Sequence, residues 1–122
     1  MQAFSFPQWR DSGATALMAR MVIERVIDGT STADVAARLV LTRLALGLKP
    51  SQLAKIVGLT QQMISNYEAG RHLISVTSSN RYVSTFGLTL DWIYRGDMKG
   101  LSHDLIMRIQ IRVKMPQGRK RA

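Results

Sequence analysis

Cysteine is absent from this chain of 122 residues, which excludes a disulfide framework, a thiol nucleophile and a cysteine zinc site. Acidic residues are scarce, since eight Asp and Glu stand against seventeen Lys and Arg. No apolar run reaches the roughly 18–20 residues that span a bilayer, and no signal-peptide pattern opens the sequence. These absences favour a protein of the reducing cytoplasm with no membrane partner.

Motifs of catalysis and metal binding are missing as well. The two histidines, His72 and His103, lie too far apart in the sequence to suggest a metal pair. The chain has no zinc-protease H-E-x-x-H, no phosphate-binding P-loop and no G-x-S-x-G nucleophile motif. We therefore expect a protein that is not an enzyme and that has no metal site and no cofactor.

The chain does contain an ordinary share of hydrophobic residues, 46%, and a large positive net charge of +9. At this length a single core buries enough apolar surface to fold without metal or disulfide support. The positive charge favours a polyanionic partner, with nucleic acid ahead of an anionic membrane surface. A basic protein without any such partner is the alternative interpretation.

Three regions can be distinguished along the chain. Residues 1–30 form an N-terminal extension, in which an apolar stripe predicts a helix over about residues 12–28. That stripe could contact a membrane surface or a second copy, but docking on the chain's own core is the favoured interpretation. Residues 31–96 hold the densest helical pattern, and residues 97–122 form a C-terminal extension with a basic tail.

Capping residues and apolar periodicity divide the middle region into short helices. Ser31 and Thr60 are good N-caps. Gly47 has the usual place of glycine after a helix, and Pro50 suits a first helical turn. The predicted helices cover residues 32–46, 50–57, 61–69, 78–86 and 89–95. Their short connections predict a compact all-α domain of five helices.

The C-terminal extension has two possible interpretations. Ser102 followed by Asp104 is typical of a helix start. Over residues 107–115, however, apolar residues alternate with Arg, Gln and Lys, which is the period of a strand. A strand here could pair with the same segment of a second copy.

A helix, a glycine turn and a second helix occupy residues 50–69. Two helices that cross at a steep angle need a small residue at the crossing, which Ala54 provides. Gly58 allows the backbone conformation of the turn. Leu53, Leu59 and Ile64 are expected to bury the inner faces. This is the spacing of a helix-turn-helix, with its marker residues at Pro50, Ala54, Gly58, Ile64 and Tyr67.

The segment of about residues 38–95 resembles the lambdoid phage repressor and Cro type (XRE-like) of helix-turn-helix family. The strings RLALGLKPSQLAKIVGLTQQMISNYEAGR and GLTLDWIYRG carry the resemblance. It implies a lambda-repressor-like fold and a sequence-specific regulator of transcription, most simply a repressor. It further implies a homodimer on double-stranded DNA, with the helix at about 61–69 lying in the major groove.

By this resemblance, the exposed side of the second helix of the motif would read bases. The candidate base-contacting residues are Gln61, Gln62, Ser65 and Asn66. Gln and Asn amides pair one donor with one acceptor, which can match N6 and N7 of adenine. A polar helix face that merely contacts solvent is the alternative.

Phosphate contacts are expected around the first helix of the motif, because a helix N-terminus offers free N–H groups to an anion. Lys49, Ser51 and Gln52 lie there, and Arg71 follows the second helix. Pro50 replaces a glutamine that is common in the family, which puts one usual backbone contact in doubt.

The resemblance also implies that Arg43 pairs with Glu68 and reaches a phosphate. Glu68 is the sole acid between Asp34 and Asp91, and a charge near the core is costly unless it is paired. Two independent surface charges are the alternative. Tyr67 and Trp92 are expected to lie in the core, Trp92 in preference to stacking on bases.

Two other functions remain open from the sequence. An antitoxin of a toxin–antitoxin pair would regulate its own promoter through the same helix-turn-helix and hold a small protein partner with a terminal extension. A helical adaptor that does not bind DNA would carry its basic surface incidentally.

Overall fold

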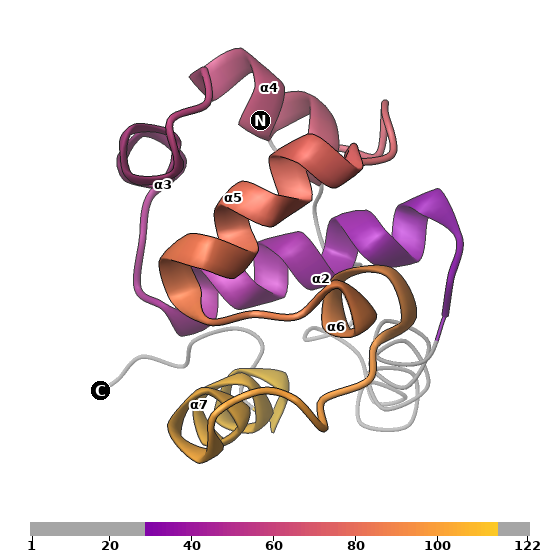
Figure 1. Cartoon of the computed structure of the whole chain (residues 1–122), viewed down its shortest axis with the longest axis vertical. Helices are drawn as coiled ribbons and strands as arrows, with labels where there is room; N and C mark the ends of the chain where they lie inside the picture. Colours follow the sequence, from indigo (N-terminus) through magenta and orange to yellow (C-terminus); the bar gives the residue numbers. More distant parts are fainter. Residues whose placement is uncertain (1–28, 115–122) are drawn as a thin grey trace, which may run out of the picture.

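The computed structural model describes residues 29–114, which fold as six helices without a strand (Figure 1). In chain order the helices are α2 (Thr32–Ala45), α3 (Pro50–Val57), α4 (Gln61–Glu68), α5 (Val76–Phe86), α6 (Leu90–Arg95) and α7 (His103–Lys114). The predicted all-α class is confirmed, and α2 to α6 correspond to the five predicted helices. The helix expected at about 12–28 and the basic tail lie outside the described residues.

Side-chain caps explain where several helices begin. At the start of α2, the Ser31 hydroxyl accepts from the Asp34 N–H at 3.1 Å, and the Asp34 carboxylate accepts from the Ser31 N–H at 3.3 Å. Thr60 and Thr89 accept the N–H groups three residues ahead in α4 and α6. Each cap satisfies a backbone donor that the helix leaves free.

The start of α5 differs from the prediction. The helix begins at Val76, ahead of the predicted start at Ser78 or Ser79, and Ser75 is its N-cap. The Ser75 hydroxyl accepts from the Ser78 N–H at 3.1 Å. Ser78 and Ser79 are both buried within the helix. All three serines suit an N-cap by residue type, so the packing of α5 decides which of them is used.

The helix α2 runs through the middle of the molecule, with α4, α6 and α7 packed against it (Figure 1). Trp92 of α6 is fully buried, and its indole N–H donates to the Thr42 hydroxyl of α2 at 2.9 Å. The guanidinium of the buried Arg38 lies 6.0 Å from the centre of the Trp92 ring and donates to the Ile93 carbonyl. Trp92 is therefore a core residue, as predicted.

Of the two interpretations of the C-terminal extension, the helix is confirmed and the strand over residues 107–115 is wrong for the part that the structure describes, because this part belongs to α7. Leu105 and Ile109 are buried and Val113 packs beside them, whereas Met107 and Ile111 are exposed. Residues two apart lie on nearly opposite sides of a helix, and residues four apart lie on the same side. The alternating pattern therefore fits a helix that is apolar on two opposite sides, and the strand pairing between two copies is lost with it.

Candidate nucleic-acid interface

The turn between α3 and α4 fixes the geometry of the motif. Gly58 has a left-handed backbone with φ of 77°, and its N–H donates to the Ala54 carbonyl at 2.9 Å. A side chain at this position would be strained by the backbone alone. The Leu59 N–H also donates to the Ala54 carbonyl, at 3.0 Å. These two bonds attach the turn before α4 to the end of α3.

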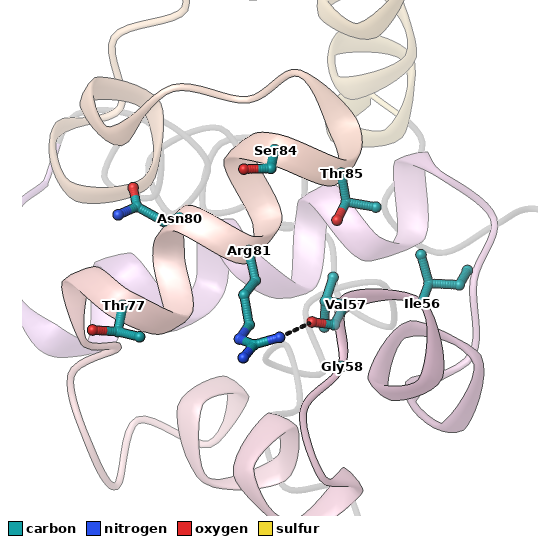
Figure 2. Close-up of a pocket in the computed structure, with 8 residues that line it drawn as sticks. All are labelled: Ile56, Val57, Gly58, Thr77, Asn80, Arg81, Ser84 and Thr85. Carbon is teal, nitrogen blue, oxygen red and sulfur yellow. Dashed lines mark hydrogen bonds between the residues drawn. The ribbon is translucent and has the colours of Figure 1, made fainter.

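Arg81 of α5 holds this turn from the other side. Figure 2 shows its guanidinium reaching the Val57 carbonyl, with a donor–acceptor distance of 3.3 Å. A Cβ atom at Gly58 would lie 2.8 Å from Nη1 of Arg81, so a side chain there would displace this guanidinium. An open groove of about 580 Å³ separates the end of α3 from α5. Its lining is Ile56, Val57, Gly58, Thr77, Asn80, Arg81, Ser84 and Thr85, a set without an acid.

The candidate base-contacting residues lie on the outer side of α4. Gln61 and Gln62 are exposed, and Ser65 and Asn66 are partly exposed. On the inner side of the same helix, Ile64 is fully buried, and the hydroxyl of the buried Tyr67 lies 3.0 Å from the Ser78 hydroxyl. The apolar inner side therefore turns the four polar side chains away from the core together, and it places Tyr67 in the core as predicted.

Asn66 links Gln62 to Arg71 through two hydrogen bonds. The Asn66 side-chain oxygen Oδ1 accepts from Gln62 Nε2 at 3.2 Å and from Arg71 Nη1 at 3.1 Å. From the sequence, Arg71 was predicted to contact a DNA phosphate, and its contact with Asn66 was not predicted. Gly70 was the available signal, because a left-handed residue after a helix (φ of 77° here) turns the chain back over the last helical turn.

The N-terminus of α3 presents the expected phosphate-binding groups. Lys49, Ser51 and Gln52 are exposed there, and Pro50 occupies the first turn. The Gln52 side-chain oxygen accepts from the Lys49 N–H at 2.8 Å. Because this oxygen is used within the protein, the Gln52 side chain offers its amide N–H groups to an external partner. Such donors suit a phosphate oxygen.

Arg43 and Glu68 join α2 to the end of α4. Arg43 Nε lies 2.9 Å and 3.1 Å from the two carboxylate oxygens of Glu68, and Arg43 Nη1 donates to the Leu48 carbonyl at 3.0 Å. Both side chains are largely buried, so they are not independent surface charges. Burial raises the pKa of the Glu68 carboxyl above its ordinary value, and the hydrogen bond and charge of Arg43 offset part of that rise. The contact of Arg43 with a phosphate stays a prediction.

The surface around the motif carries positive charge without exposed acid. Glu68 is the sole acid between residues 44 and 90, and Arg43 neutralises it. Lys49, Lys55 and Arg71 are exposed in this stretch. Within the described residues 29–114, no cluster of three or more His, Cys, Asp or Glu could hold a metal ion. None of the helices in that range has the length and apolar character needed to cross a membrane. The arrangement is suited to an extended anion.

The family model described as helix-turn-helix matches residues 32–93, just over half of the chain. The chain therefore belongs to the Cro/C1-type (XRE) helix-turn-helix family of DNA-binding domains, a family that is generally not catalytic. The resemblance seen in the sequence is thus confirmed. No curated protein and no solved structure gives a significant match. The matched residues include α2 to α5 and end within α6, before α7.

Proposed function

We propose that this protein is a sequence-specific regulator of transcription, of the repressor type, that inserts α4 into the major groove of double-stranded DNA. The observation that carries the proposal is the shared outward direction of Gln61, Gln62, Ser65 and Asn66 on a helix-turn-helix whose inner side is buried. Family membership supports DNA binding, and the polar row supports reading of a defined sequence.

Base contacts and phosphate contacts have separate roles in this proposal. The amide groups of Gln61 and Gln62 supply donor–acceptor pairs that distinguish adenine in the major groove. Lys49, Ser51 and Gln52 at the start of α3 hold phosphates, as does Arg71. Arg43 belongs to the same set through its position beside the turn after α2. Affinity then comes largely from neutralised phosphates and specificity from the amides.

The mechanism is occupancy of a promoter. A bound protein blocks polymerase without chemistry, so no cofactor and no metal is required. Members of this structural class bind as dimers to half-sites about 34 Å apart. We therefore propose a homodimer acting on DNA in the cytoplasm.

Selection of bound sequences from a random duplex pool tests the proposal directly. The wild-type protein should enrich one sequence at physiological salt. Gln61→Ala or Gln62→Ala should then cost roughly 1–3 kcal/mol on that sequence and relax one base position. The melting temperature should not change, because both side chains are exposed. Gln110→Ala, which removes an exposed glutamine from α7, is the matched control and should leave binding unchanged.

The two alternative functions give different results in the same experiment. A helical adaptor would enrich no sequence above bulk duplex, and that outcome would refute the proposal. An antitoxin would enrich a sequence and would also co-purify with a small protein held by residues 1–30 or 97–122.

A further inference from the structure

A hydrogen-bonded group of three side chains lies at the outer side of α4. We define it as the amide triad: Gln62 and Asn66, which lie one helical turn apart, and Arg71, which follows the helix. Asn66 Oδ1 accepts from both of the others. We infer that Arg71 is a positioning residue that sets which polar atoms of the triad face a base pair. This inference rests on the proposed function, because it concerns how the same helix reads DNA.

The orientation of the Asn66 amide follows from its two bonds. A carbonyl oxygen of an amide has two lone pairs, and here Gln62 and Arg71 each donate to Oδ1. Asn66 therefore presents only its Nδ2 hydrogens to a partner. Such a group can donate to O6 or N7 of guanine, N7 of adenine or O4 of thymine. It cannot form the two-bond contact with adenine unless it gives up one bond of the triad.

Gln62 keeps the complementary set of atoms. It donates through one Nε2 hydrogen to Asn66 and retains the other hydrogen together with Oε1. This remaining donor–acceptor pair matches N6 and N7 of adenine. The triad thus assigns different roles to two amides that the sequence alone makes equivalent: Gln62 as the reader of adenine, and Asn66 as a donor to base acceptors.

Both the backbone and the side chain of Arg71 are hydrogen-bonded to Asn66. Its backbone N–H donates to the Asn66 carbonyl at 3.0 Å, and its guanidinium returns to the Asn66 side chain. Gly70, with φ of 77°, makes this return possible. Fixing the amides before DNA arrives reduces the rotamer freedom that binding must remove. A residue that contacted only phosphate would not have this effect on base preference.

The test measures a discrimination ratio at each position of the selected site, defined as the Kd for the site with one base pair exchanged divided by the Kd for the intact site. Wild-type protein should give a ratio of roughly 5 to 150 at the positions that α4 reads. Arg71→Ala should lower that ratio toward 1 at one or two adjacent positions. Lys49→Ala, which removes an exposed charge outside the triad, should weaken all sites by one factor and leave every ratio unchanged.

A double-mutant cycle shows whether Arg71 acts through Asn66. In an Asn66→Ala background, Arg71→Ala should have no further effect on the ratios, and the loss of its charge should weaken binding to all sites by the same factor. If Arg71→Ala lowers the affinity for every site by the same factor in the wild-type background, Arg71 is a phosphate contact alone and the inference is wrong. If the wild type enriches no sequence at all, the proposed function fails instead.

A measurement on the free protein provides a check that does not need DNA. Relaxation of the side-chain NH₂ groups should show a higher order parameter for Asn66 in the wild type than in Arg71→Ala. Lys49→Ala should retain the wild-type value. An Asn66 amide that is equally ordered in all three proteins would overturn the inference.

Discussion

The α3–α5 region and the α6–α7 region of this protein differ in whether exposed acids lie beside their exposed cations. From Lys49 to Phe86, the exposed cations have no exposed acid beside them, because Glu68 is buried against Arg43. In α6 and α7, by contrast, acids stand four residues before cations. Asp91 lies 3.6 Å from Arg95, and Asp104 lies 3.0 Å from Arg108, all of them exposed.

This difference shows why net charge alone locates no interface. Exposed pairs of this kind contribute little to stability, but each cancels the field of a cation at a distance. Two cations of the α6–α7 region are therefore offset by paired acids, and this region supplies the core with Trp92, Ile93, Leu105 and Ile109. The α3–α5 region retains its positive field and its outward amides. We expect changes in the core residues of the α6–α7 region to affect stability and changes in the exposed cations and amides of the α3–α5 region to affect binding.

Arg43→Ala should give the largest loss of stability, because Arg43 lies where the two roles meet. The substitution leaves the Glu68 carboxylate buried without its cation, which should cost about 3–5 kcal/mol in the free energy of unfolding. Urea denaturation measures the loss. Arg95→Ala, which breaks an exposed pair, is the control and should leave the free energy unchanged within error. Equal losses in both variants would remove the distinction between the buried pair and the exposed pair.

The pH dependence of this loss has a defined sign. Burial already raises the pKa of Glu68 in the folded protein, so the folded state holds its proton more strongly than the unfolded chain. The resulting stability is present below the ordinary pKa and is lost as the pH rises through the folded pKa. Without Arg43 that pKa should rise further. Arg43→Ala should therefore destabilise the protein less at pH 4 than at pH 7. In a Glu68→Gln background, the loss caused by Arg43→Ala should no longer depend on pH.

Ile109→Ala should give the next largest effect and should separate the two regions most clearly. Ile109 is fully buried on the side of α7 that faces the core, so its truncation should cost about 2–5 kcal/mol. The exposed Ile111 offers a matched control on the opposite side of the same helix. Ile111→Ala should have little effect. Base preference should be the same in both variants wherever they are folded, and an altered preference would contradict the division into two regions.

The two isoleucines also show what the sequence could not decide about the fold. Leu105, Ile109 and Val113 repeat every fourth residue, but Met107 and Ile111 between them create the period of a strand. The pattern does not favour helix over strand, so contact with α2, distant in sequence, decides. The start of α5 has the same cause. By residue type Ser78 and Ser79 suit a helix start as well as Ser75 does, but their hydroxyls bond to Tyr67 and Tyr94 inside the fold.

Residue type and spacing were sufficient to predict the structure where a position had a single strongly favoured residue role. Thr60 as cap, Gly58 at the turn and the buried Ile64 follow from residue type and spacing, and together they determine the outward side of α4. The orientation of the amides on that side did not follow. It depends on the return of Arg71 past Gly70 to within 3.1 Å of Asn66, a geometry that spacing does not specify.

Lys49→Ala and Arg95→Ala should sharpen the comparison of charge with a smaller, purely electrostatic effect. Each removes one exposed cation, but only Lys49 lies in the region without exposed acid. Lys49→Ala should reduce the slope of log K against log salt by about 1, as expected for one lost phosphate contact. Arg95→Ala should leave the slope unchanged. The measurement is the affinity for specific and for random duplex across salt concentrations. Equal slopes in the two variants would contradict the claim that a cation paired with an acid contributes nothing to DNA binding.

The smallest predicted effect lies on the inner side of the α3–α5 region, where two buried tyrosines differ in their hydroxyl groups. The Tyr67 hydroxyl bonds to Ser78, whereas the Tyr82 hydroxyl has no hydrogen-bond partner among residues 29–114. Burial raises the pKa of Tyr82, so its phenol stays neutral. Tyr67→Phe should cost about 1 kcal/mol, because the Ser78 hydroxyl loses its partner. Tyr82→Phe should be neutral or stabilising, because it removes a desolvated group that gains nothing in return. Thermal unfolding of the two variants compares them directly, and a larger loss for Tyr82→Phe would show that its hydroxyl has a partner in solution.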